Sequence, residues 1–293
     1  MAKFASAQKQ AASVMKSLQN RVLKSVGTVR NYEQALTRAA EYAKSEKIEG
    51  GLRAMTKADA IAYLEQRAAV VGQKSIDMER QAIQKMMQHV TQKIGVNERL
   101  SVIKSSTPQA LTPRAYTPQQ VALVAGAQTP RNALATELAH AAGLRAHELL
   151  TLRPASERAA DIRPALESKF RDGGEKYTVE GKGGLIREVK IPSELALRLE
   201  ATRLDTPIRV EDRGIFYTQH YDIAGGHAFS RSFSAASGRE LGWSAGAHGL
   251  RHSYAQERMR ELQHSGIERA TALETVSQEL GHFRPEITET YLR

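Results

Sequence analysis

The chain has 293 residues, of which 42 are Lys or Arg and 32 are Asp or Glu, and it contains no cysteine. This length allows two domains with cores of their own, and a hydrophobic fraction of 41% is typical of a globular protein rather than a disordered one. The absence of cysteine excludes disulfide frameworks, thiolate-bound metal clusters and thiol nucleophiles, and no apolar run is long enough to predict a transmembrane helix.

The net charge of +10 is unevenly distributed. Residues 1–117 hold 19 Lys and Arg against 9 Asp and Glu, whereas residues 118–293 hold 23 of each kind. Six basic residues and no acid precede Glu33. A basic half joined to a neutral half indicates that the first half binds a polyanion, although a solvated basic face that only aids solubility gives the same pattern.

The N-terminal part of the chain has the periodicity of helices. Apolar residues recur at three- and four-residue spacing in four stretches, which predicts helices over about 11–26, 28–45, 56–69 and 76–94. Thr56 with Asp59 resembles a capping box, and Gly95 is a candidate C-terminal cap. We therefore expect a compact helical domain over residues 1–95.

A linker is expected over residues 96–117, because this segment is rich in Ser, Thr and Pro and lacks periodicity. A second domain is expected over residues 118–293. Its start is marked by Thr117 and Pro118, which provide an N-cap and a proline in the first helical position. Thr129 and Pro130 repeat this signal for a second helix.

The middle of this second domain predicts a β-hairpin. Residues 176–192 are two short strand-like runs around a glycine-rich turn, with Lys182 at the tip. After Ser193 the pattern is helical again. The expected fold class is therefore mainly α with a small β-hairpin or sheet, an α+β arrangement in the second domain.

Five local motifs follow one another in this domain. They are Gly-Leu-Arg-x-x-Glu-Leu-x-x-Leu at 143–152, Gly-Lys-Gly at 181–183, His-x-Leu-Arg-His at 248–252, Leu-Gly-His at 280–282, and Tyr291. Each alone has an ordinary structural explanation. Arg145 and Glu148 would be a solvated ion pair, the lysine turn only a turn, and the tyrosine a packing residue. His248 and His252 could share a helix face, but without a third ligand they do not indicate a metal site.

The set as a whole, in this order and spacing, resembles the tyrosine recombinase (phage-type integrase) family over most of residues 118–293. The spacing of nine residues from His282 to Tyr291 is the most specific part of the match. The N-terminal helices and linker resemble the core-binding domain and interdomain connection of that family in layout only. The resemblance implies a two-domain, C-shaped clamp around duplex DNA.

The resemblance also implies a role for each motif residue. Tyr291 would attack the phosphorus, Arg145 and Arg251 would stabilise the phosphoryl oxygens, and His248 would accept the tyrosine proton. His282 would be a further hydrogen-bond donor, Lys182 would be the general acid, and Glu148 would orient neighbouring side chains. No metal and no cofactor would be required.

For Arg187 and His252, other roles are expected. Arg187, on the returning hairpin strand, is expected to contact a backbone phosphate or form an ion pair, and His252 to be a buried structural donor.

The implied function is site-specific DNA strand exchange through a 3′-phosphotyrosyl intermediate and a Holliday junction, serving integration, excision or resolution. The implied partners are double-stranded DNA with an inverted-repeat core site, three further copies of the chain in a homotetramer, and an accessory directionality factor, with no membrane. The implied location is the bacterial cytoplasm, at the nucleoid. Two alternatives stay open: a type IB topoisomerase-like relaxing enzyme, and a DNA-binding regulator on the same fold.

Overall fold

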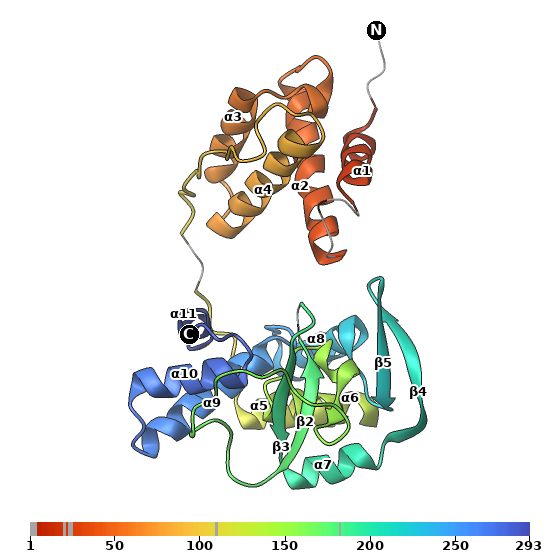
Figure 1. Cartoon of the computed structure of the whole chain (residues 1–293), viewed down its shortest axis with the longest axis vertical. Coiled ribbons are helices and arrows are strands. Elements are labelled where there is room, and N and C mark those ends of the chain that lie inside the picture. Colours follow the sequence, from red (N-terminus) through yellow and green to blue (C-terminus); the bar gives the residue numbers. More distant parts are fainter. Residues whose placement is uncertain (1–4, 20–21, 23–25, 109–110, 182) are drawn as a thin grey trace. The chain divides into compact units, whose positions relative to one another are not determined.

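A computed structural model of the chain describes residues 5–19, 22, 26–108, 111–181 and 183–293. Lys182 therefore lies outside the described residues. The chain divides into two compact units, Met1–Ala110 (unit 1) and Leu111–Arg293 (unit 2), each with its own hydrophobic core (Figure 1). In the part of the chain that is described, no helix combines the length and the apolar character needed to cross a membrane.

Unit 1 is built from helices. Its elements are α1 (Ala7–Leu18), α2 (Val26–Ser45), the 3₁₀ helix η1 (Gly51–Ala54), α3 (Lys57–Ala68) and α4 (Gln73–His89). The capping box is confirmed, because the Thr56 hydroxyl accepts a hydrogen bond from the Asp59 amide and the Asp59 carboxylate accepts one from the Thr56 amide. The alanine-rich faces of α1 and α2 let these helices pack closely against α4.

Two predicted helix ends in unit 1 are wrong. The first helix ends at Leu18 because Gln19 adopts an extended conformation, so the predicted stretch to residue 26 is divided between two helices. The fourth helix ends at His89 rather than near residue 94. Gln92 there adopts the left-handed conformation that the sequence assigned to Gly95.

The core of unit 1 contains one buried charged group. Glu79 is fully buried on α4, where its carboxylate accepts hydrogen bonds from Tyr63 at 2.8 Å, Arg67 at 3.0 Å and Arg38 at 2.9 Å. Burial opposes ionisation of Glu79, but the bonds from Arg67 and Tyr63 outweigh it and lower the pKa of this carboxyl. The carboxylate therefore ties α2, α3 and α4 together at one point.

Unit 2 combines helices with two small sheets (Figure 1). Its helices are α5 (Pro118–Gly126), α6 (Pro130–Ala141), η2 (Glu148–Thr151), α7 (Ser193–Glu200), α8 (Gly226–Leu241), α9 (Gly249–His264), α10 (Arg269–Glu279), α11 (Pro285–Thr288) and η3 (Glu289–Tyr291). Its strands are β1 (Arg153–Pro154), β2 (Glu175–Glu180), β3 (Ile186–Ile191), β4 (Arg203–Asp212) and β5 (Ile215–Tyr221).

The predicted hairpin is confirmed as the antiparallel pair β2 and β3, and β1 adds a third strand beside β2. A second antiparallel hairpin, β4 and β5, stands where the sequence predicted continued helix. Its two-residue turn places Arg213 and Gly214 at positive φ, as in a type I′ turn. Leu204, Ile208 and Val210 do alternate with polar residues in β4, but most of this strand is exposed and Pro207 lies within it, and the helical prediction after Ser193 extends over it.

The border between the units falls inside the segment 96–117, and both flanks of that border are packed. Ser105 and Ser106 donate hydroxyl hydrogen bonds to carbonyls of unit 1. In unit 2 the Tyr116 amide donates to the hydroxyl of Ser253 on α9 at 2.8 Å, and Arg114 donates to the carbonyl of Ala245. The second of these flanks therefore packs beside the beginning of α9.

Candidate active site

Unit 2 brings six of the seven site residues predicted from the sequence into one cluster. Arg145 comes from the turn after α6 and Glu148 from the start of η2. His248 and Arg251 come from the beginning of α9. The C-terminal segment supplies His282, after α10, and Tyr291, in η3. The seventh, Lys182, is the one outside the described residues.

Glu148 is the centre of this cluster. Its side chain is fully buried, and it contacts three arginines: Arg145 at 2.7 Å, Arg187 at 2.7 Å and Arg251 at 3.7 Å. Burial favours the neutral acid, but Arg187, Arg251 and Arg145 outweigh it and hold the pKa of Glu148 well below its usual range. Three guanidinium groups share one carboxylate, so the cluster carries a net positive charge and suits an anion.

Arg251 is held by the backbone. Its side chain is fully buried, and its guanidinium donates to the carbonyls of Gly143 and Leu280. Burial and the neighbouring Arg145 lower the pKa of Arg251 to about 9, which still leaves it cationic at neutral pH. The same guanidinium lies 5.8 Å from the centre of the Tyr291 ring.

Gly143 and Gly281 lie beside the cluster at positions where a side chain would clash with its neighbours. Gly143 has φ +58°, and a Cβ there would lie 2.8 Å from the Tyr254 ring and 2.9 Å from a methyl group of Leu280. Gly281 has φ +70°, and a Cβ there would lie 2.7 Å from the Cδ of Arg187. Both positions need a left-handed backbone and close contact, which only glycine tolerates.

The hydroxyl of Tyr291 faces His248. The hydroxyl oxygen lies 3.1 Å from the Nε2 of His248, and the tyrosine side chain is buried. Three imidazole rings surround the phenol ring, with centroids 4.6 Å away for His252, 5.0 Å for His282 and 5.4 Å for His248. The tyrosine oxygen therefore has a base within hydrogen-bond reach, the first requirement for general base catalysis.

The three histidines are neutral at physiological pH. Burial, followed by the charge of Arg251, lowers the pKa of both His248 and His282 to about 3. Burial and Arg114 lower the pKa of His252 to about 4. A neutral imidazole keeps one nitrogen as an acceptor, so His248 can receive a proton.

The hairpin turn that carries Lys182 begins beside this cluster. A Cβ on Gly181 would lie 3.5 Å from the Glu148 carboxylate and 3.9 Å from the Nη1 of Arg145. The amide of Gly181 donates to the carbonyl of Leu185 at 2.7 Å. The described residues therefore place the start of the turn at the site, and the role of Lys182 stays a prediction.

The structure decides between the two roles foreseen for Arg187. Its side chain is buried and pairs with Glu148, and it also donates to the Glu279 carbonyl at 2.6 Å and the Gly143 carbonyl at 3.4 Å. It is thus an ion-pair partner that joins strand β3 to the cluster. The burial of Glu148 in its pair with Arg145 is not visible in the sequence, because three-residue spacing fits a buried or a solvated carboxylate equally.

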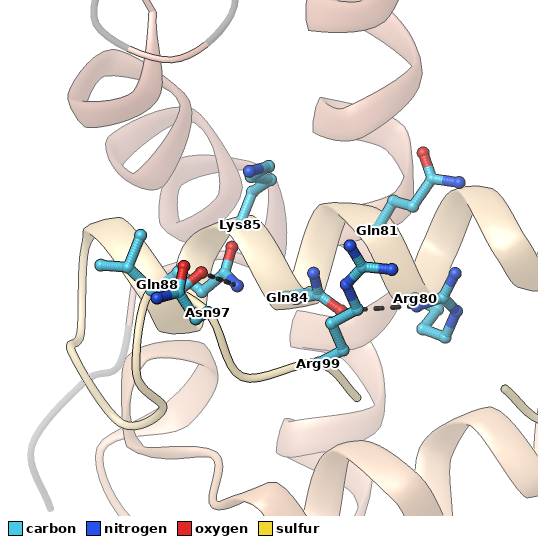
Figure 2. Close-up of a pocket in the computed structure, with 8 residues that line it drawn as sticks. Arg80, Gln81, Gln84, Lys85, Gln88, Asn97 and Arg99 are labelled. Carbon is cyan, nitrogen blue, oxygen red and sulfur yellow. Dashed lines mark hydrogen bonds between the residues drawn. The ribbon is translucent and has the colours of Figure 1, made fainter. Parts of the chain in front are cut away.

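Unit 1 carries a separate polar pocket of about 460 Å³ (Figure 2). It is lined by Arg80, Gln81, Gln84, Lys85 and Gln88 of α4 and by Val96, Asn97 and Arg99 of the segment that follows. The lining contains cations and amides but no acid. The Nε of Arg80 and the Oε1 of Gln88 are buried and make no hydrogen bond within the described residues.

Among the described residues, no group of three His, Asp or Glu side chains could hold a metal ion.

Neither a protein-family model nor a curated protein matches the sequence. Solved structures do match the fold. The XerH site-specific recombinase, in a post-cleavage complex with palindromic difH substrate, is 16% identical with a TM-score of 0.59, over 98% of this chain and 81% of that chain. The lambda integrase tetramer bound to a Holliday junction is 16% identical with a TM-score of 0.60, over 100% of this chain and 78% of that chain.

A third match is the integrase of the Tn1549 transposon in complex with a circular intermediate DNA. It is 11% identical with a TM-score of 0.53, over 99% of this chain and 96% of that chain. The chain therefore has the tyrosine recombinase fold, and the predicted fold class of helices with small antiparallel sheets is confirmed.

Proposed function

We propose that this protein is a site-specific tyrosine recombinase, which cleaves and rejoins DNA through a 3′-phosphotyrosyl intermediate. The observation that carries the proposal is the pairing of the Tyr291 hydroxyl with His248 at 3.1 Å, beside a cluster in which three arginines share one carboxylate. A nucleophile, a neutral base and an excess of positive charge are what phosphoryl transfer without a metal demands.

The proposed cleavage forms one bond and breaks one. The Tyr291 oxygen attacks the scissile phosphorus and passes its proton to His248, while the bond from phosphorus to the 5′-oxygen breaks. Arg145, Arg251 and His282 stabilise the charge on the phosphoryl oxygens. Lys182 is proposed to protonate the leaving 5′-oxygen. Rejoining reverses each step, so the energy of the phosphodiester is kept in the tyrosyl bond.

Unit 1 is proposed to contact the DNA outside the scissile phosphate. Gln81, Gln84 and Lys85 follow one another at helical spacing along one face of α4, whereas the neighbouring Gln88 is buried (Figure 2). An α-helix fits the major groove, where glutamine can bond adenine and arginine can bond guanine, while lysine contacts phosphate. The concentration of the net charge in residues 1–117 supports this assignment.

Strand exchange is proposed to occur in a tetramer, on a core site with inverted repeats. Support comes from the fold matches, one of which is a tetramer on a Holliday junction and another a complex with a palindromic substrate. Units 1 and 2 would then serve as the core-binding and catalytic domains of a clamp around DNA.

A covalent trapping assay tests the proposal. The full chain is incubated with nicked duplexes, drawn from its genomic neighbourhood and from a randomised site library, and analysed on denaturing gels beside Tyr291→Phe. We expect a covalent protein–DNA band that Tyr291→Phe abolishes. If no library duplex gives a band while binding stays tight, the protein is a DNA-binding regulator. If a band forms but supercoils relax without exchange between two sites, it is a topoisomerase-like enzyme.

A further inference from the structure

Thr288 makes a contact with the active site that the proposed mechanism does not use. Its side chain is fully buried at the end of α11, three residues before Tyr291. Its Oγ1 lies 3.0 Å from the Nδ1 of His282. The other ring nitrogen of His282, Nε2, lies 3.3 Å from the Nη2 of Arg251. The imidazole is thus held at both nitrogens.

Chemistry determines which nitrogen carries the proton. A guanidinium has only donors, so Arg251 must donate to His282, and Nε2 must be the unprotonated nitrogen. The proton of the neutral ring is then on Nδ1, and this N–H donates a hydrogen bond to the Thr288 hydroxyl oxygen. The low pKa of His282, caused by burial and by Arg251, agrees with a neutral ring.

We propose that Thr288 is a positioning residue that fixes the orientation of the His282 ring through its hydroxyl, while Arg251 sets the tautomer. This inference rests on the proposed function where it concerns the reaction. To donate to a phosphate bound at Arg251, Nε2 takes up a proton from solvent, and the ring stays neutral when Nδ1 releases its own proton to solvent. A hydroxyl accommodates both states, because it accepts a hydrogen bond from Nδ1–H and donates one to bare Nδ1. A carboxylate or a methyl group could not do both.

The first test reads the tautomer directly in the DNA-free protein. The full chain, labelled with ¹⁵N at histidine, is studied by NMR, and His282→Gln identifies the signal of His282. We expect the wild type and Thr288→Ser to show a bare Nε2 and a protonated Nδ1 whose proton is hydrogen-bonded and exchanges slowly with solvent, and Thr288→Val to lose that slow exchange. The matched control is Thr290→Val, because Thr290 is exposed and its hydroxyl bonds only the Ile287 carbonyl. A wild type protonated on Nε2, or a Thr288→Val signal like that of the wild type, would overturn the proposal.

The second test measures single-turnover formation of the covalent complex on saturating nicked DNA. We expect Thr288→Val to be about tenfold slower, as for the loss of one buried hydrogen bond, with DNA affinity unchanged. Thr288→Ser should restore the rate, and Thr290→Val should keep it. An unchanged rate in Thr288→Val, or an equal loss in Thr288→Ser, refutes the positioning role. If the wild type forms no covalent complex, the proposed function fails, while the NMR result still decides the tautomer.

Discussion

The Nε2 of His248 and the hydroxyl of Tyr291 are 3.1 Å apart within one chain, although 43 residues separate them in sequence. The beginning of α9 supplies the first and η3 the second, and both lie beside the arginines that surround Glu148. The described residues of a single chain therefore place the proposed nucleophile and the proposed base within hydrogen-bond reach of each other.

This relationship predicts cleavage in cis. When Tyr291→Phe is mixed with Arg145→Ala, delivery of the tyrosine in trans would combine an intact tyrosine from the second variant with an intact pocket from the first. We expect the mixture to form no more covalent complex than Arg145→Ala alone. The measurement is a denaturing gel with the two variants tagged to different sizes. A strong covalent band on the Arg145→Ala chain would show that tyrosines are exchanged between copies.

Glu148 is expected to be a main determinant of the stability of unit 2. In Glu148→Gln the side chain keeps its shape, but the buried guanidinium groups of Arg187 and Arg251 and the partly exposed one of Arg145 lose their common carboxylate. Removing one partner of a buried ion pair costs about 3–5 kcal/mol, so the free energy of unfolding should fall by about that amount. Urea unfolding of the full chain, followed by far-UV circular dichroism, measures it.

The matched control is Glu137→Gln, which removes a carboxylate from an ion pair with Arg198 at the surface. An exposed pair contributes about 0–1 kcal/mol, so this variant should unfold nearly as the wild type does. Equal losses in the two variants would mean that the Glu148 cluster contributes no more than a surface pair.

The low pKa values of His248 and His282 predict a pH dependence of stability. Both are about 3 in the folded protein, against about 6.5 in the unfolded chain. Between these values the unfolded state binds more protons, so the stabilising contribution is complete above pH 6.5 and is lost as the pH falls toward 3. We expect the free energy of unfolding to drop from pH 7.5 to pH 5, as measured by urea unfolding at each pH. The double variant His248→Gln, His282→Gln should show a smaller drop, and an identical drop would contradict this origin.

Gly143 is expected to tolerate no side chain. In Gly143→Ala the new Cβ meets Tyr254 and Leu280, and the backbone must keep φ +58°. We expect a loss of about 1–3 kcal/mol in the free energy of unfolding and a slower cleavage step, because the Gly143 carbonyl holds Arg251 and Arg187. Thermal unfolding and the covalent trapping assay measure the two effects. Gly126→Ala is the control, since a Cβ there meets nothing within 4 Å. Similar losses in both variants would show that the close contacts and positive φ at Gly143 are not the cause.

The sequence singled out candidate site residues that the structure brings together, but it did not show the contacts among them, and their catalytic roles stay a prediction. The order of the motifs identified Arg145, His248 and Tyr291, because the chemistry of each side chain and its spacing are visible in the sequence. The burial of Glu148 was not predictable, because Arg187, which makes it possible, lies on a strand 39 residues away. Tertiary contacts of this kind leave no local pattern.

In the fold, too, the elements that could be predicted are those with a local signal in the sequence. The helix beginning at Thr56 and the hairpin around Lys182 carry local signals, namely a capping box and a glycine-rich turn between apolar runs. The β4–β5 hairpin carries a weaker signal, because Leu204, Ile208 and Val210 alternate with polar residues but Pro207 lies within β4 and most of the strand is exposed. The end of α4 was missed because a non-glycine residue, Gln92, adopts the left-handed conformation.

The pocket on unit 1 is expected to contribute to DNA binding through Lys85 and Arg99. Each lines the pocket on a unit that carries most of the net positive charge of the chain. If each contacts one phosphate, Lys85→Ala and Arg99→Ala should weaken binding to all sequences and should lower the slope of log affinity against log salt by about 1 each. Gel-shift titrations at several salt concentrations measure both quantities. Lys57→Ala is the matched control, because it removes the same charge from α3, where Lys57 is already paired with Glu98 at 2.5 Å. Equal changes in slope for Lys57→Ala and Lys85→Ala would mean that DNA responds to the overall charge of unit 1 and does not bind at the pocket.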